Sequence, residues 1–206
     1  MRSDSALSAA TVTEIRPAIQ ATADNVLIRL IASGDREAMR MLFARHSARV
    51  FHFIVRLIGQ NSVAEDLASE VFIDVWRNAG QFEARCQVST WLLAIARYKA
   101  LSWLRSRATD QLDDAIAGAI EDPADNPEVS CSKIDTRALL RKCLTQLSPA
   151  HREVIDLIYY HERSMDEVAA ILQIPAPTVR TRMFYARKRL AELLKAHGVE
   201  HAWQCW

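Results

Sequence analysis

The sequence has few of the residues that turn-rich or disulfide-bonded folds require. It holds 5 glycines and 6 prolines in 206 residues, whereas a β-sandwich or barrel needs such turn residues at short, regular intervals. Its 4 cysteines (Cys86, Cys131, Cys143 and Cys205) form no CxxC pair, so we expect reduced thiols rather than disulfides. No apolar run approaches the roughly 18 residues of a membrane span, and the N-terminus has acids and hydroxyls where a signal peptide has an apolar stretch. These absences predict a helical, cytoplasmic protein without membrane insertion.

Positive and negative charge are sorted along the chain, although the net charge is only +1. Residues 60–83 are rich in acids, residues 85–109 contain bases and no acid, and residues 108–134 are acidic again. The stretch 178–195 carries its bases with a single acid, Glu192. A nearly neutral chain of this kind can present two basic surfaces and two acidic ones.

Helical periodicity divides the chain into two parts. Helical patterns run from about Asp24 to Arg107 and resume near Asp135. The acidic stretch between them contains Pro123 and Pro127 and no sustained apolar stripe, which is typical of a linker. The pattern predicts an all-α fold of two small helical domains, with a flexible arm (1–22), a first domain (23–107), a flexible acidic linker (108–134), a second domain (135–196) and a tail (197–206).

The second domain contains a predicted helix-turn-helix. The stretch "SMDEVAAIL" has Ser164 and Glu167 at the spacing of a capping box, which begins a helix. "QIPAP" then interrupts the helix, and a basic helix follows. On a helical wheel this basic helix has one apolar stripe that we expect to be buried (Val179, Met183, Ala186, Leu190 and Leu194). The opposite side presents Arg180, Thr181, Phe184 and Lys188, with Tyr185 at its edge.

This outward face has two interpretations. An isolated exposed aromatic residue on a charged, solvated face is common in proteins. On a recognition helix, however, arginine can contact guanine edges, phenylalanine can touch a thymine methyl group, and further bases can hold phosphates. Because a capped helix and a turn precede this helix, we favour DNA recognition.

The first domain contains an acidic helix with an aromatic ridge. Asp66, Glu70 and Asp74 follow one another at i, i+4 and i+8, so their like charges repel. Phe72 and Trp76 lie beside this acidic stripe. In one interpretation, the acids form a solvated face and the aromatic rings are buried. They can also be a docking surface for a basic protein, with acids for complementarity and rings for contact area.

A segment that interleaves bases with aromatic rings follows. Arg97, Lys99, Arg105 and Arg107 alternate with Trp91, Tyr98 and Trp103. Such a surface suits opened DNA, because unstacked bases sit on rings while cations follow the phosphates. Trp91 and Trp103, taken singly, can equally be core residues.

Two long stretches together resemble a known family. "DLASEVFIDVWRNAGQFEARCQVSTWLLAIARYKALSWLRSR" and "SMDEVAAILQIPAPTVRTRMFYARKRL" are similar to the sigma-70 family of bacterial transcription initiation factors. The short two-domain form resembles the extracytoplasmic-function (ECF) subgroup. The resemblance implies an alternative sigma factor, active in stress responses, that binds core RNA polymerase, selects promoter DNA and melts the −10 element. It further implies no enzymatic activity and no cofactor, a monomer when free, and a cognate anti-sigma factor as a partner.

The resemblance also implies roles for individual residues. Residues 66–76 match the helix that docks on the polymerase clamp helices, which assigns this contact to Asp66, Glu70, Phe72, Asp74 and Trp76. Residues 81–105 match the segment that captures the melted −10 element (Arg85, Thr90, Trp91, Arg97, Tyr98, Lys99, Trp103 and Arg105), and the loop 83–90 would hold a flipped base. The recognition helix would read the −35 element (Thr178, Arg180, Thr181, Phe184, Tyr185 and Lys188). The chain departs from many relatives at Tyr98, where they have asparagine, and at Pro177, where they often have glycine.

Two other function classes remain beside this assignment, and one possible metal site is a separate question. A helix-turn-helix regulator that acts without replacing the sigma factor would leave the first domain's acidic and basic segments unexplained. An enzyme would need a nucleophile, metal or phosphate-loop motif, and none is recognisable. His197, His201 and Cys205 would align as metal ligands on a continuous helix, but Gly198 and the nearby chain end favour a frayed tail and no metal site.

Overall fold

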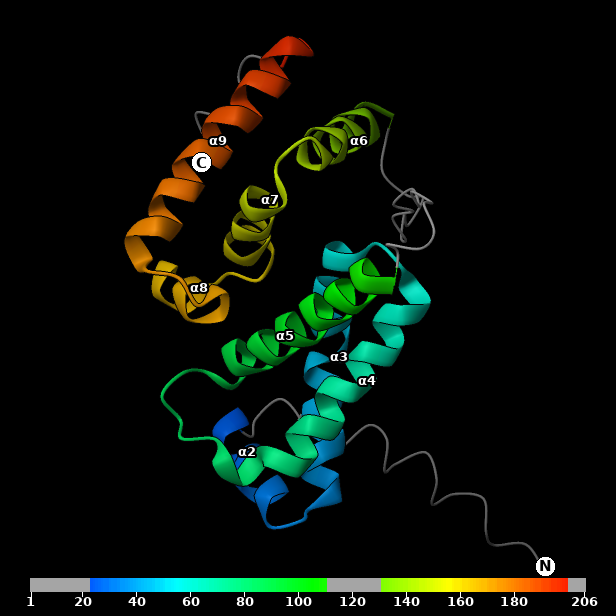
Figure 1. The fold of residues 1–206 in the computed structure, drawn as a ribbon, viewed down its shortest axis with the longest axis vertical. Coiled ribbons are helices and arrows are strands. Elements are labelled where there is room, and N and C mark those ends of the chain that lie inside the picture. Colours follow the sequence, from blue (N-terminus) through cyan, green and yellow to red (C-terminus); the bar gives the residue numbers. More distant parts are fainter. Residues whose placement is uncertain (1–22, 111–130, 200–206) are drawn as a thin grey trace, which may run out of the picture. The chain divides into compact units, whose positions relative to one another are not determined.

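The structure is a computed structural model of the chain, and it describes residues 23–110 and 131–199 (Figure 1). These residues are helical and contain no strand, which confirms the predicted all-α fold. The helices form two compact units. No helix among the described residues is long and apolar enough to cross a membrane.

The first unit is built mainly from α2 (Asp24–Ala32), α3 (Arg36–Ile58), α4 (Asn61–Asn78), the 3₁₀ turn η1 (Ala79–Gln81) and α5 (Val88–Asp110). Each helix turns an apolar stripe inward, because residues three and four apart lie on one face. The fully buried side chains come from all four α-helices and include Leu27, Ile31, Leu42, Phe53, Val71, Val75 and Leu92.

A polar contact fixes the start of α2 on α3. The carboxylate of Asp24 accepts a hydrogen bond from His46 Nε2 at 2.8 Å and forms an ion pair with Arg45. The imidazole of His46 is almost fully buried. Burial alone would raise the pKa of Asp24, but the hydrogen bonds and charges of His46 and Arg45 outweigh burial and lower this pKa below its usual value.

The second unit is built mainly from α6 (Cys131–Thr145), α7 (Pro149–Ile155), the π-helical turn η2 (Asp156–Tyr160), α8 (Met165–Leu172) and α9 (Ala176–Ala196). Helix α9 packs against α6, α7 and α8. Ser148 caps α7, since its side chain accepts from the backbone N–H of His151, and Pro149 follows in the first turn, where no amide donor is needed. Arg152 donates to the carbonyl oxygens of Leu144, Thr145 and Leu147, which satisfies the end of α6.

The helices that flank the predicted linker are longer than the sequence indicated. Helix α5 continues to Asp110 instead of ending near Arg107, and α6 begins at Cys131 instead of near Asp135. Acidic residues do not by themselves end a helix, and Pro123 and Pro127 lie well inside the predicted linker, so both helices extend a few residues into it. The predicted arm (1–22), the middle of the linker (111–130) and the end of the tail (200–206) lie outside the described residues.

Candidate DNA- and polymerase-binding surfaces

Local side-chain contacts set the geometry of the helix-turn-helix. The Oγ of Ser164 accepts from the backbone N–H of Glu167 at 3.2 Å, and the carboxylate of Glu167 accepts from the backbone N–H of Ser164 at 2.9 Å. This capping box confirms the predicted start of α8. The helix ends at Leu172, and the following Gln173 adopts a left-handed conformation with φ of 55° that directs the chain into the turn before α9.

Helix α9 turns its apolar stripe inward and its rings outward, as the helical wheel predicted. Val179, Met183, Ala186, Leu190 and Leu194 are buried. Phe184 and Tyr185 are 64% and 53% exposed, and their rings meet edge to face with centroids 5.4 Å apart. Arg180, Thr181 and Lys188 are exposed on the same helix, while Thr178 is partly buried. Aromatic rings this large are usually buried, so this face is suited to a contact outside the domain.

One basic residue of α9, Arg187, contacts another element of its own domain. The Nε of Arg187 donates to the hydroxyl of Tyr159 on η2 at 2.8 Å, and its guanidinium lies 5.5 Å from the centroid of that ring. The helical wheel placed Arg180 and Lys188 on the outward face and assigned no role to Arg187. The contact with Tyr159 could be found only from the packing of α9 against the preceding helices.

The acidic helix α4 carries a mixed acidic and apolar surface. Asp66 and Glu70 are exposed, and Trp76 is 38% exposed. Ile73, which the sequence analysis did not single out, is 47% exposed. Phe72 is different, because it is only 3% exposed and its ring packs edge to face on Phe43 of α3 with centroids 4.8 Å apart. Phe72 is therefore a core residue in this structure and not part of the surface.

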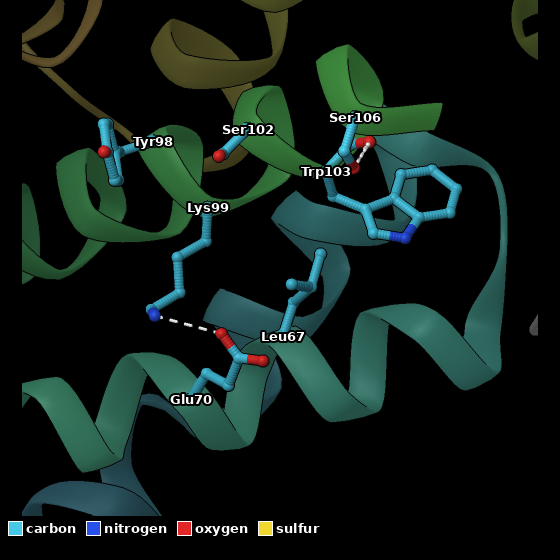
Figure 2. Close-up of a pocket in the computed structure, with 7 residues that line it drawn as sticks. All are labelled: Leu67, Glu70, Tyr98, Lys99, Ser102, Trp103 and Ser106. Atoms are coloured by element: carbon cyan, nitrogen blue, oxygen red, sulfur yellow. Dashed lines mark hydrogen bonds and ion pairs between the residues drawn. The ribbon is translucent and has the colours of Figure 1, made fainter. Parts of the chain in front are cut away.

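Lys99 of α5 points toward Glu70 of α4 (Figure 2). Its ammonium lies 3.0 Å from a carboxylate oxygen of Glu70 and 2.9 Å from one of Asp74. Partial burial alone would lower the pKa of Lys99, but the hydrogen bonds and charges of Asp74 and Glu70 outweigh burial and raise this pKa above its usual value. In this structure the ammonium of Lys99 is held by α4, and its contact with DNA stays a prediction.

The loop before α5 is shorter than the sequence indicated. Helix α5 begins at Val88, so Thr90 lies in its first turn and is only 2% exposed. Thr90 is therefore a buried residue of α5 and not a surface residue. Within the loop, Arg85 pairs with Glu83 at 2.6 Å, and the intervening Ala84 has a left-handed backbone with φ of 54°.

The remaining residues predicted for the −10 contact are distributed along α5. Tyr98 is 68% exposed and Arg105 is exposed, while Arg97 and Trp103 are partly buried. Trp91 is partly buried too, and its ring packs on Phe82 with centroids 5.0 Å apart. A pocket of about 250 Å³ opens between α4 and α5 (Figure 2), and its lining is Leu67, Glu70, Tyr98, Lys99, Ser102, Trp103 and Ser106.

No group of three potential metal ligands occurs in the part of the chain that the structure describes. The Nδ1 of His197 lies 2.9 Å from the carbonyl oxygen of Leu193, one turn earlier in the chain. His201 and Cys205, the other members of the predicted trio, lie outside the described residues.

The fold and these surfaces together define a two-domain, all-helical DNA-binding protein. One domain carries a helix-turn-helix with an outward aromatic and basic face, and the other carries an acidic helix beside a basic and aromatic one. Residues 42–109 match the family Sigma-70 region 2, and residues 143–192 match Sigma-70, region 4. The chain belongs to the sigma-70 family, within its ECF subgroup.

Curated relatives extend over most of the chain. It is 30% identical to the ECF RNA polymerase sigma factor SigK of Mycolicibacterium vanbaalenii, over 89% of this chain and 93% of that protein. It is 28% identical to the protein of the same name from Mycobacterium sp. strain KMS, over 77% of this chain and 84% of the relative.

Two solved structures are similar in fold. The sigma factor RpoE of Bartonella quintana, solved with the anti-sigma factor NepR, is 27% identical with a TM-score of 0.63 and covers 76% of this chain and 96% of its own. CnrH, solved with the cytosolic domain of CnrY, is 26% identical with a TM-score of 0.61 and covers 85% of this chain and 99% of its own.

The family settles the choice between the two transcription functions. A regulator that leaves the sigma factor in place does not need a region 2 domain, and here that family covers the first domain. The chain is an alternative sigma factor that directs promoter-specific transcription initiation.

Proposed function

We propose that the exposed face of α9 reads the −35 promoter element. The observation that carries this proposal is the exposure of Phe184 and Tyr185 beside Arg180 and Lys188, on a helix whose opposite stripe is buried. Arginine on such a face can bind a guanine edge, and phenylalanine can touch a thymine methyl group. Thr178 and Thr181 lie in the first turns of α9, where the ends of recognition helices approach bases and phosphates.

The acidic helix α4 is proposed as the contact with core RNA polymerase. Asp66, Glu70 and Asp74 supply negative charge, and the exposed parts of Ile73 and Trp76 supply apolar area beside it. This combination suits a basic helical partner, since complementary charge gives orientation while aromatic and aliphatic side chains give binding energy.

The loop before α5 and the outer face of α5 are proposed to hold the melted −10 element. Tyr98 offers an exposed ring for base stacking, Arg85 and Arg105 offer exposed cations, and Arg97, Trp91 and Trp103 are partly accessible. Ala84 supports this assignment, because a non-glycine residue with positive φ holds a loop in a restricted shape.

Regulation by an anti-sigma factor is proposed from the structural relatives. Both RpoE of Bartonella quintana and CnrH were solved with a protein bound to the sigma factor. We further infer that this chain acts without catalysing a reaction, as a monomer when free, and in the cytoplasm, where promoter DNA and RNA polymerase meet.

Transcription in a purified system tests the proposed function. The full chain, added to core RNA polymerase and promoter templates, should support initiation that is lost when either the −35 or the −10 element is scrambled. Core polymerase alone and the chain alone serve as the two controls. Binding of the free chain to promoter duplex, with stimulation only when another sigma factor is present, would overturn the proposal.

A further inference from the structure

Lys99 bridges the helix that we assign to polymerase binding and the helix that we assign to DNA. Its ammonium lies within 3.0 Å of Glu70 and 2.9 Å of Asp74, and both carboxylates belong to α4. Figure 2 shows the lysine side chain extending from α5 across to Glu70. The contact joins residues that are 29 positions apart in the chain, so it holds two separate elements together.

The three side chains of this bridge differ in exposure. The Lys99 side chain is 16% exposed, whereas those of Glu70 and Asp74 are 54% and 35% exposed. The Lys99 side chain is thus largely covered, while the side chains of Glu70 and Asp74 are more accessible to solvent. A carboxylate has two oxygens and about four lone-pair sites, so each can accept a cation from outside as well as Lys99.

The bridge lowers the negative charge that α4 offers to a partner. The acidic stripe of Asp66, Glu70 and Asp74 carries a formal charge of −3, and Lys99 reduces the local total to −2. A cation of the polymerase that approaches Glu70 or Asp74 also approaches the Lys99 ammonium, and the two like charges repel. Interface charges that are partly excluded from water interact more strongly than free surface charges.

We propose that Lys99 is a positioning residue that weakens polymerase binding by competing with the partner's cations for Glu70 and Asp74. This inference rests on the proposed docking role of α4. On this proposal, Lys99 lowers the affinity for core polymerase. A lysine that contacts the polymerase or DNA directly would raise the affinity instead. An alternative sigma factor shares core polymerase with other sigma factors, so a residue that limits affinity affects how much polymerase it occupies.

The test is the affinity of full-length variants for core RNA polymerase. Lys99→Met keeps the aliphatic stem and removes the charge, so we expect core binding about 3- to 10-fold tighter, with a steeper loss of affinity as salt rises. Lys99→Arg keeps the charge and should not bind more tightly than the unmodified chain. Lys142→Met, on α6 in the other unit, removes one positive charge from an exposed lysine and should leave core affinity unchanged.

A variant without the two carboxylates distinguishes the proposed role of Lys99 from the proposed docking role of α4. In a chain with Glu70→Gln and Asp74→Asn, core binding should be weaker, and Lys99→Met should then tighten it much less, because the competition for the two carboxylates has been removed. If these two acid substitutions leave core affinity unchanged, the docking role of α4 is wrong. If they weaken binding but Lys99→Met alone fails to tighten it, the docking role stands and the proposed role of Lys99 is wrong.

A variant that fails to fold is identified and replaced. Circular dichroism and thermal melting check each variant, and Lys99→Gln, which removes the charge but keeps an amide NH2 group as hydrogen-bond donor, replaces Lys99→Met if the latter unfolds. A lysine with only a structural role would lower stability and core affinity together. Tighter core binding at unchanged or lower stability is the result that only the competition explains.

Discussion

At the scale of single residues, polar contacts at the ends of helices set local geometry. Asp24 connects the first turn of α2 to Arg45 and to the nearly buried His46 of α3. Its carboxylate is one quarter exposed, with a side-chain relative accessibility of 25%, so its charge is stabilised mainly by these partners. A contact of this kind links an early element to the bundle and makes stability depend on the protonation of one group.

Asp24→Asn should destabilise the first unit by about 1–3 kcal/mol, because hydrogen bonds to a charged group are lost. The pKa of Asp24 is lowered on folding, so its contribution is present above its unfolded pKa of 3.8 and disappears as pH falls through the folded value. Thermal melting between pH 3 and pH 7 checks this. The difference between the two chains should shrink toward the acid end, and a constant difference would contradict the assignment.

Gln173→Gly should stabilise the second unit by up to about 1 kcal/mol, because Gln173 adopts φ of 55° at the end of α8, where glycine carries no side-chain strain. The measurement is urea unfolding of the full chain. Gln173→Ala is the matched control, since it keeps a Cβ in the same backbone conformation and should give no gain. Equal effects of the two substitutions would show that strain at this position is negligible.

At the scale of elements, each helix has a buried apolar stripe and an exposed face that is available to partners. On α9 the division places Arg180, Phe184 and Lys188 outside, although their roles differ with position along the helix. Residues near the beginning of a recognition helix approach base edges, while residues farther along approach the phosphates.

Three alanine substitutions on α9 should therefore have different effects. Arg180→Ala should cost about 1–3 kcal/mol and relax the preference at one −35 position, because a bidentate contact to guanine is lost. Lys188→Ala should weaken all promoters about equally and reduce the salt dependence of binding. Phe184→Ala should weaken promoters with thymine at the contacted step. Transcription by reconstituted holoenzyme on a library of −35 sequences measures all three.

Thermal melting provides the control for these substitutions. Phe184 is 64% exposed, so Phe184→Ala should leave the melting temperature nearly unchanged. A sharp fall in melting temperature with an unchanged promoter profile would mean that the ring serves the core of the domain.

Helix α4 allows the docking assignment to be tested without disturbing Lys99. Asp66 is exposed and is not one of the two carboxylates that hold Lys99. Asp66→Lys should weaken core polymerase binding by on the order of tenfold, because it places a like charge against a basic partner. Glu37→Lys on α3, an exposed acid of the same unit, is the matched control and should have little effect. Equal losses for both would point to net charge rather than to the face of α4.

At the scale of the whole molecule, two helical units of different function share one chain. Region 2 and region 4 match separate parts of the sequence, and each unit has its own buried apolar residues. Promoter recognition by both needs them on one tether, because tethering raises the effective concentration of the second contact once the first has formed.

Residues 23–110 and 131–199 should fold as separate fragments, in agreement with the proposed division into two domains. The circular dichroism spectra of the two fragments should sum to the helical signal of the full chain over these residues. A mixture of the fragments should fail to direct initiation from a −35/−10 promoter, since the tether is missing. A fragment that is unfolded alone but folded in the full chain would contradict the division.

The sequence by itself determined the features that depend on neighbours along the helix. The all-α class, the capping box of Ser164 and Glu167, and the outward placement of Phe184 and Tyr185 all follow from spacings of three and four residues. These spacings are fixed by helix geometry and do not depend on the rest of the fold, so a wheel and a cap motif were sufficient.

The tertiary structure decided which polar and aromatic residues remain available to a partner. Phe72 is covered by Phe43, Thr90 is buried at the start of α5, and Lys99 is held by Glu70 and Asp74. In the sequence, Lys99 was one base among several in a basic segment, and its carboxylate partners lie on another helix. Packing between helices brings such residues together, and no periodicity within a single helix records which neighbour a long side chain will meet.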